Sequence, residues 1–318
     1  MYDVIALGEL LIDFTSSAPS SQGNPQFEAN PGGAPCNVLA MLARLGRRAA
    51  FVGKVGDDLF GRMLKGSIVE AGIDAGALVL DPAAHTTLAF VQNAPDGDRA
   101  FSFYRDPGAD ELLTPEELPE SALRSAGIFH FGSLSLTREP SRAATRRAVA
   151  LAAEGGAVVS FDPNLRPSLW KNLDAARDEM LWGCSVCQVL KVAEEELSFL
   201  TTEEDLEAGA AKLRRDFPNI RLLLVTKGKE GSTAFWREHQ VSRPGFPVEA
   251  IDTTGAGDTF CGCCLHHILE WGLENLDEER LGEMLSFANA AAGLVTTRKG
   301  ALRSMPEEAE VRRLLANR

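Results

Sequence analysis

Several features are scarce or absent in this sequence of 318 residues, and each absence excludes a class of protein. No apolar stretch approaches the roughly 18 residues that a membrane span requires. Basic residues are outnumbered, with 32 Lys and Arg against 45 Asp and Glu and a net charge of -13. A protein that binds the phosphate backbone of nucleic acids needs a basic face. We therefore expect no membrane and no nucleic-acid partner.

A targeting segment is also missing from the N-terminal stretch MYDVIALGELLIDF, which has neither a Lys/Arg-rich start nor a small-residue cleavage site. The six cysteines include one C-x-x-C pair, Cys184 and Cys187, but no second pair at zinc-ribbon spacing. We expect structural free thiols rather than a metal site or a disulfide framework, in a reducing compartment. The sequence therefore predicts a cytoplasmic protein.

Two common nucleotide-binding signatures are absent as well. The stretch GAGDTF has Phe260 where a dinucleotide fingerprint has its third glycine, and it lies far from the first strand-helix unit. No G-x-x-x-x-G-K-[ST] motif occurs. A dehydrogenase is disfavoured, and any phosphoryl transfer must use a different phosphate cradle.

The pattern that is present alternates short apolar runs with segments of helical period. It predicts an α/β fold in which helices cover both faces of a mostly parallel sheet. No linker separates two domains, so residues 1–318 are expected to form one domain. Two parts break the rhythm, a polar segment after Thr15 and two alternating strands around a turn at Pro95–Asp98. We expect these parts, at about 12–31 and 86–106, to form a small β lid.

The stretch IDTTGAGDTF places small residues directly before an amphipathic helix. The first N–H groups of such a helix are free to hold an anion, so Gly255, Ala256 and Gly257 predict a phosphate cradle. Asp258 follows in the first helical turn. Its carboxylate fits two roles, an acid-base group or a group that interacts favourably with the helix dipole.

A second group of polar residues lies near the N-terminus. Gly32 and Gly33 permit a close approach of the backbone, Asn37 follows at the start of a helix, and Asp13 is expected to end the first strand. Amide and carboxylate groups suit the recognition of sugar hydroxyls. Each residue taken singly also fits a plain strand-to-helix turn.

Six blocks of sequence, in order, are similar to those of one known family. They are GGAPCNVLAMLARLG with FVGKVGDDLFG, FDPNLRPSLW, LKVAEEEL, VTKGKEGS and DTTGAGDTFCG. Together they resemble the ribokinase-like carbohydrate kinases, the PfkB family, from Val4 to Gly300. The resemblance implies a ribokinase-like three-layer sandwich with a β lid. It also implies ATP-dependent phosphorylation of a sugar hydroxyl with Mg2+.

The resemblance also implies roles for individual residues. Gly255, Ala256 and Gly257 would form the anion hole for the transferring phosphoryl group, and Asp258 would be the base. Glu194 would organise Mg2+ through water, and Lys191, which stands where the family pattern has asparagine, would contact phosphate. The remaining implied nucleotide-binding residues are Gly257, Thr226, Lys227, Gly228, Gly231 and Asn289. In many family members a loop matching Asp252 and Thr254 holds a potassium ion.

The resemblance leaves several substrates open. The residues expected to bind the sugar are Asp13, Gly32, Gly33, Asn37, Phe101, Phe103, Arg105 and Arg166, and we favour D-fructose phosphorylated at O6. Arg105 and Arg166 also occur in 2-keto-3-deoxygluconate kinases, where arginines meet a carboxylate, although those enzymes tend to have Tyr at positions 90 and 103.

The alternatives are a 2-keto-3-deoxygluconate kinase and an aminoimidazole riboside or ribose kinase. A non-catalytic scaffold that binds sugar or nucleotide is disfavoured by the intact GAGD turn. Relatives often pair through the lid, so we expect a homodimer.

Overall fold

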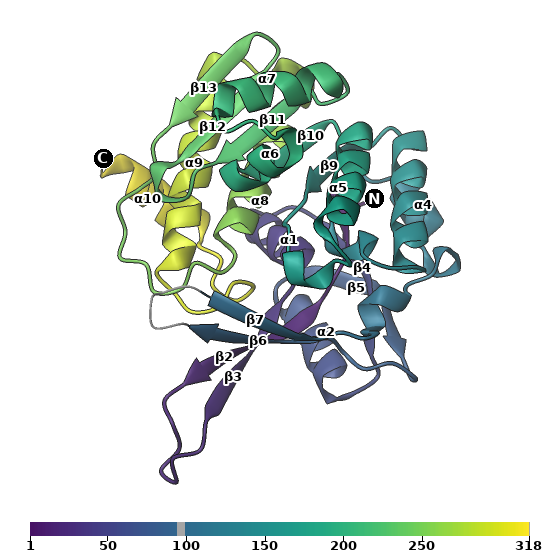
Figure 1. Ribbon diagram of the computed structural model, residues 1–318. Coiled ribbons are helices and arrows are strands. Elements are labelled where there is room, and N and C mark those ends of the chain that lie inside the picture. The colour runs from purple at the N-terminus through teal and green to yellow at the C-terminus, as the bar shows by residue number, and fades with distance from the viewer. Residues whose placement is uncertain (94–98, 318) are drawn as a thin grey trace.

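The computed structural model describes residues 1–93 and 99–317, without the side chains of residues 92, 93 and 99–101. A nine-stranded sheet forms the centre of the described part, with helices on both faces, and a separate four-stranded sheet lies beside it (Figure 1). This arrangement confirms the α/β fold class. The predicted turn at Pro95–Asp98 lies outside the described residues.

The central sheet is parallel except at one end. Its order is β13-β12-β11-β10-β9-β8-β1-β4-β5, and β12 and β13 are antiparallel to their neighbours. The strands are β1 (Val4–Leu7), β4 (Ala49–Gly56), β5 (Ile73–Asp81), β8 (Ile128–Gly132), β9 (Val158–Asp162), β10 (Val189–Ala193), β11 (Leu222–Thr226), β12 (Ser232–Trp236) and β13 (His239–Arg243).

Helices bury both faces of this sheet, as the continuous apolar strands predict. Alternate side chains of β1 separate accordingly, with Val4 and Ala6 in one buried cluster and Ile5 and Leu7 in the other. The first cluster contains α1 (Ala34–Arg44), α2 (Leu59–Glu70), α8 (Ala256–Trp271), α9 (Glu278–Thr296) and α10 (Glu308–Ala316). The second contains α3 (Glu120–Arg124), α4 (Ser141–Glu154), α5 (Leu173–Val186), α6 (Glu194–Thr201) and α7 (Leu206–Asp216).

The smaller sheet has the order β3-β2-β6-β7. Its strands are β2 (Leu11–Ser17), β3 (Gln26–Gly32), β6 (Leu88–Asn93) and β7 (Arg99–Tyr104), and the β2–β3 hairpin projects from the body of the protein (Figure 1). The expectation that Asp13 ends the first strand is wrong. The first strand ends at Leu7, and Asp13 lies inside β2, because the apolar run is interrupted at Gly8 and Glu9 and resumes in the second sheet.

The chain changes from one face of the central sheet to the other between two adjacent strands. After β1 and the hairpin it continues into α1 on one face, whereas after β8 it continues into α4 on the opposite face. In open α/β sheets, ligands bind at such a switch point, outside the carboxyl ends of the strands. The fold therefore places a binding crevice beyond β1 and β8.

Two further observations concern the described residues. None of their helices is long and apolar enough to cross a membrane. All six cysteines are buried and free.

Candidate active site

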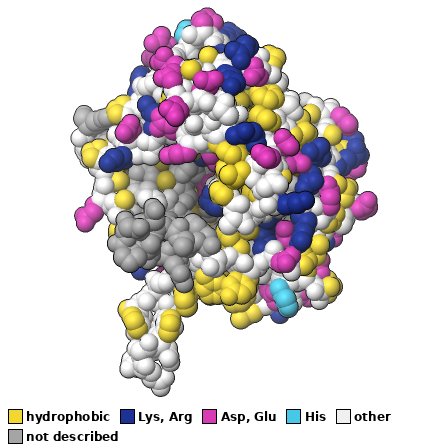
Figure 2. All heavy atoms as spheres, viewed as in Figure 1, with side chains coloured by type: hydrophobic (Ala, Val, Ile, Leu, Met, Phe, Trp, Pro, Cys, Tyr) yellow, Lys and Arg dark blue, Asp and Glu magenta, His cyan; other side chains and the backbone are white. Residues whose placement is uncertain are grey.

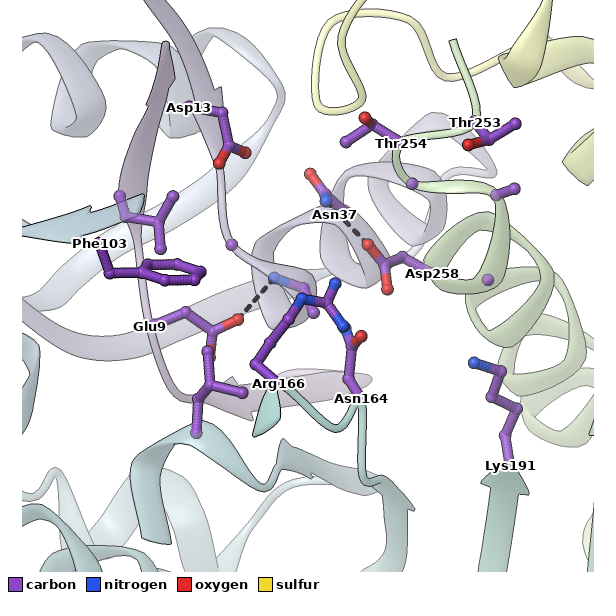
Figure 3. Close-up of a pocket in the computed structure, with 17 residues that line it drawn as sticks. Glu9, Asp13, Asn37, Phe103, Asn164, Arg166, Lys191, Thr253, Thr254 and Asp258 are labelled. Atoms are coloured by element: carbon purple, nitrogen blue, oxygen red, sulfur yellow. Dashed lines mark hydrogen bonds between the residues drawn. The ribbon is translucent and has the colours of Figure 1, made fainter. Parts of the chain in front are cut away.

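A cavity of about 390 Å³ opens at this switch point (Figure 3). Residues from both sheets and from the N-termini of α1 and α8 line it, although they are far apart in the sequence. The lining residues are Glu9, Leu11, Asp13, Gly33, Ala34, Asn37, Phe103, Leu134, Asn164, Arg166, Lys191, Thr253, Thr254, Gly255, Ala256, Gly257 and Asp258.

The start of α8 forms one wall of the cavity. Gly255 precedes the helix with φ 79°, a left-handed conformation that favours glycine, and a Cβ there would lie 2.5 Å from Ala301 Cβ. A Cβ on Gly257 would lie 2.9 Å from Lys191 Nζ. Small residues therefore leave the first-turn N–H groups accessible from the cavity, where they can hold an anion.

Asp258 lies at the end of this turn and is 7% exposed. Its Oδ2 accepts a hydrogen bond of 2.8 Å from Asn37 Nδ2, so α1 fixes its orientation. Burial and the nearby Asp162 carboxylate raise the pKa of Asp258 to about 6, against the opposing effects of Asn37, Lys191 and Arg166. A carboxylate with this pKa is largely ionised at neutral pH and is a stronger base than an ordinary aspartate.

Beneath the start of α8 lies a buried ion pair. Lys191 Nζ, from β10, is 3.0 Å from Asp162 Oδ2 at the end of β9. Burial lowers the pKa of Lys191, but Asp162 and Glu196 raise it by a larger amount, so the net change is upward. The ammonium group is therefore charged where it borders the cavity.

The N-terminus of α1 forms the adjoining wall. Gly33 precedes the helix with φ 124°, and a Cβ there would lie 2.4 Å from the carbonyl oxygen of Glu9. Glu9 Oε1 accepts a hydrogen bond of 2.8 Å from Ala34 N. Burial raises the pKa of Glu9 to about 7. This side chain was not predicted as a site residue, since an acid after a strand carries no signal until the fold brings it to the switch point.

The smaller sheet contributes Asp13 and Phe103 to the cavity (Figure 3). Gly32 lies behind Asp13, because a Cβ on Gly32 would lie 2.2 Å from Asp13 Oδ2. The side chain of Phe101, which was also predicted to bind sugar, lies outside the described residues. The cavity thus has one apolar wall and several polar groups, an arrangement that suits a polyhydroxylated ligand.

The loop after β9 brings Arg166 and Asn164 into the cavity. Asn164 has φ 49°, a conformation that asparagine tolerates better than most residues. Arg166 was predicted and Asn164 was not, although Asn164 stands in the same FDPNLRP block.

Arg105 lies elsewhere. It borders a neighbouring cavity of about 410 Å³, and its side chain is 1% exposed. Asp110 Oδ2 accepts hydrogen bonds from the guanidinium group, at 2.8 Å from Nε and with an ion-pair distance of 2.6 Å to Nη2. Thr137 Oγ1 and the Leu134 carbonyl oxygen, each at 3.0 Å, accept the others.

Most of the residues predicted to contact the nucleotide do not line this cavity. Thr226, Lys227, Gly228 and Gly231 lie at the carboxyl end of β11 and in the turn after it. The Asn289 side chain joins α9 to β12 and β13, since Ser232 Oγ donates to its Oδ1 at 2.9 Å and its Nδ2 donates to the Arg243 carbonyl oxygen at 3.0 Å. This bonding is structural, so any contribution of Asn289 to nucleotide binding requires another contact.

The predicted metal-binding residues fall into two places. Glu194 is exposed in the first turn of α6. In the loop before α8, Asp252 Oδ1 accepts hydrogen bonds from Thr254 N at 2.9 Å and Thr254 Oγ1 at 2.7 Å, and Asp252 Oδ2 accepts one from Gly300 N at 3.0 Å. No group of three or more His, Cys, Asp or Glu side chains that would hold a metal ion occurs in residues 1–93 and 99–317.

Comparison with known proteins gives consistent matches. The chain matches the pfkB family carbohydrate kinase model over residues 1–308. It is 46% identical to fructokinase-1 of Zea mays, over 98% of this chain and 97% of that protein. The crystal structure of a Xylella fastidiosa fructokinase with bound ATP has 35% identity and a TM-score of 0.90, covering 100% of this chain and 99% of that chain. A Vibrio cholerae O395 fructokinase double mutant with bound fructose, ADP and potassium ion has 32% identity and a TM-score of 0.88, covering 99% and 98%.

Proposed function

The chain belongs to the pfkB family of carbohydrate kinases, and we propose that it transfers the γ-phosphoryl group of ATP to the 6-hydroxyl group of D-fructose. The observation that carries this proposal is the position of Asp258, a buried base hydrogen-bonded to Asn37, in the first turn of α8. Fructokinases with high identity over nearly the whole chain support the choice of sugar.

The residues of the cavity suit an in-line transfer. The hydroxyl of the sugar approaches Asp258, which orients it and takes its proton. Negative charge that develops on the phosphoryl oxygens meets the N–H group of Gly257 and the ammonium group of Lys191. Asp13, Asn37 and Gly33 are positioned to bond the other hydroxyls, and Phe103 offers an apolar surface to the C–H face of the sugar.

Glu194 is the residue proposed to hold Mg2+, through water. Its exposed carboxylate fits this role, because Mg2+ keeps several waters and takes most of its other ligands from the phosphates of the nucleotide. When bound, the ion neutralises charge on the phosphates.

A potassium ion is proposed for the loop that contains Asp252 and Thr254. The Asp252 carboxylate joins Thr254 of this loop to Gly300, and carboxylate and hydroxyl oxygens are the type of ligand that suits a hard cation. An ion there would strengthen the positive potential at the start of α8. Turnover in potassium chloride should exceed turnover in sodium chloride at the same ionic strength, and equal turnover would remove the ion from the proposal.

The bonding of Arg105 favours a neutral sugar. An acid sugar needs cationic groups that offset the desolvation of its carboxylate. Arg105 is committed to Asp110, and Glu9 and Asp13 add acidic groups to the cavity. Arg166 lines the cavity and keeps a 2-keto-3-deoxygluconate kinase as the second candidate.

A panel of fructose, 2-keto-3-deoxygluconate, ribose and aminoimidazole riboside tests the choice of sugar. The value of kcat/KM, measured by ADP release, should be highest for fructose. A higher value for the acid sugar would overturn the fructose assignment and leave the kinase chemistry intact. No release of ADP with any sugar would instead favour a non-catalytic binding protein.

The smaller sheet is proposed to act as a lid that covers the sugar and excludes water. Its strands β6 and β7 are fixed at their common base by Asp110, which accepts hydrogen bonds from Thr87 Oγ1 at 2.5 Å and from Arg105 Nε at 2.8 Å. A fixed base and a projecting outer part suit a cover that moves as one unit over the cavity.

A homodimer through this sheet is also proposed. The face opposite the cavity carries an aromatic cluster of Phe14, Phe27, Phe90 and Tyr104, in which Phe27 is 40% and Tyr104 67% exposed. Figure 2 shows hydrophobic side chains on the projecting hairpin and where it joins the body. Exposed apolar surface of this kind marks interaction sites.

A cytoplasmic location remains a prediction, supported by the six free thiols.

A further inference from the structure

The ammonium group of Lys191 lies against the start of α8. Lys191 is 7% exposed and lines the cavity, and its Nζ is 2.9 Å from where a Cβ on Gly257 would lie. The positive charge is therefore next to the backbone N–H groups that are proposed to receive the phosphoryl oxygens. A lysine side chain has four rotatable bonds, so this position requires something that holds it.

Asp162 is the group in contact with that ammonium. The register of β10 against β9 pairs Val189 with Ser160 and Leu190 with Phe161, so residue 191 comes next to residue 162. The distance from Lys191 Nζ to Asp162 Oδ2 is 3.0 Å, and Asp162 is 2% exposed. Apart from this ion pair, neither carboxylate oxygen of Asp162 has a hydrogen-bond partner in the described part of the chain.

We propose that Asp162 is a positioning residue for phosphoryl transfer, which holds the Lys191 ammonium at the first turn of α8. The inference rests on the proposed kinase function, since it assigns Lys191 to the phosphoryl group. A buried carboxylate and its one cation attract each other strongly in the low-dielectric interior, and removal of either leaves the other charge unpaired. Asp162 itself does not line the cavity, so its effect on the reaction passes through Lys191 and through its charge.

The charge of Asp162 also acts on the base. The charged and polar groups that face Asp258 are Asp162 from β9, Lys191 from β10, Arg166 from the loop after β9 and Asn37 from α1. Of these, Asp162 raises the pKa of Asp258 and the other three lower it. Loss of the Asp162 charge should therefore lower the pKa of Asp258.

A double-mutant cycle of Asp162→Asn and Lys191→Met tests the positioning role, with kcat measured for ATP and fructose. Each single variant should lose about 10²-fold in kcat, because misplacement or loss of the cation removes its contact with the transition state. At a pH above the acidic limb, where the effect of Asp162 on the pKa of Asp258 does not limit turnover, the double variant should be no slower than Lys191→Met alone, since Asp162 has no cation left to position. Losses that multiply in the double variant would overturn the inference, as would near-normal kcat for Asp162→Asn.

The pH profile provides a readout that a purely structural role would not change. The acidic limb of the curve of kcat/KM against pH should move to lower pH in Asp162→Asn. It should stay in place in Asp162→Glu, which keeps the charge. The control is Asp81→Asn, which takes one carboxylate from the buried Lys54 outside the cavity and should leave the limb unchanged. An unmoved limb in Asp162→Asn contradicts the inference.

Folding does not limit this test. Asp162→Asn and Lys191→Met each leave one buried charge unpaired. The double variant removes both charges and Asp162→Glu keeps both, so these two variants should keep the fold. If only these two fold, the inference requires that the double variant lose about 10²-fold in kcat while Asp162→Glu keeps most of its activity. Failure of the wild type to turn over ATP with any sugar would instead reject the proposed function.

Discussion

Asn37 Nδ2 donates a hydrogen bond of 2.8 Å to Asp258 Oδ2 between side chains that are 221 positions apart in the sequence. Both residues are buried, Asn37 in α1 and Asp258 in the first turn of α8. The bond fixes the direction of the proposed base and stabilises its ionised form. It also joins the wall proposed to bind the sugar to the wall proposed to bind the phosphoryl group.

Replacement of Asn37 with Ala should affect the base in a defined direction. Because the hydrogen bond lowers the pKa of Asp258, its loss raises that pKa, and the acidic limb of kcat/KM moves to higher pH. The value of kcat should also fall, by about 10-fold to 100-fold, since Asp258 loses its orientation. The control is Asn219→Ala, which removes hydrogen bonds to the Cys184 and Cys187 carbonyl oxygens and should leave the limb in place. Identical profiles for Asn37→Ala and wild type would refute this role.

Substitution of Asp258 with Asn should separate activity from stability. Turnover should fall by about 10² to 10⁴ while sugar binding persists, because only the proton acceptor is lost. The raised pKa means that ionised Asp258 destabilises the fold. The protonated form contributes stability that is full below the ordinary aspartate pKa of 3.8 and is lost as the pH rises through about 6. At pH 7.5 the variant should be more stable than wild type by about 1 to 3 kcal/mol, and near pH 4 the difference should vanish. Urea unfolding at the two pH values measures this, and near-normal turnover would reject Asp258 as the base.

Removal of the Arg105 side chain should be costly to the fold. Arg105→Ala leaves the buried Asp110 without its cation and should lower the free energy of unfolding by about 3 to 5 kcal/mol. The matched control is Arg138→Ala, whose half-exposed pair with Asp106 should contribute less than about 1 kcal/mol. Equal unfolding midpoints for Arg105→Ala and wild type would show that Asp110 does not need this partner, and Arg105 would again be available to an acid sugar.

The aromatic face of the smaller sheet predicts a dimer. Light scattering of the wild type at assay concentration should give twice the monomer mass, and Phe27→Ser with Tyr104→Ser should reduce it toward the monomer, because apolar surface drives association. Leu173→Ser, a change at an exposed apolar residue of α5, is the control and should not alter the mass. A wild-type mass equal to that of the monomer would reject the dimer and leave the kinase proposal intact.

The layers of the fold could be predicted from the sequence because each strand and helix carries its own periodicity. The start of α8 could be predicted as well, since Gly255, Ala256, Gly257 and Asp258 are consecutive and their small size has a local meaning. The strand that holds Asp13 could not, because an apolar run does not show which of two sheets it enters.

The charges of the site depend on contacts that no local pattern contains. Burial raises the pKa of Glu9, and the hydrogen bond from Ala34 N at the start of α1 opposes this effect. Burial raises the pKa of Asp258 most, and Asp162 and Lys191, from two different strands, shift it further in opposite directions. The family resemblance identified Lys191, but its ion pair with Asp162 follows from the register of β9 and β10.

The position of the phosphate in the product tests the proposed function most directly. Fructose and ATP are incubated with the wild-type protein, and ADP and fructose 6-phosphate are measured in the same samples with coupling enzymes specific for each. The account predicts equal amounts of the two, because Asp258 receives the primary hydroxyl O6, and no fructose 6-phosphate above background from Asp258→Asn over the same period. Formation of ADP with phosphate at another position of fructose, or no phosphorylated fructose at all, would contradict it.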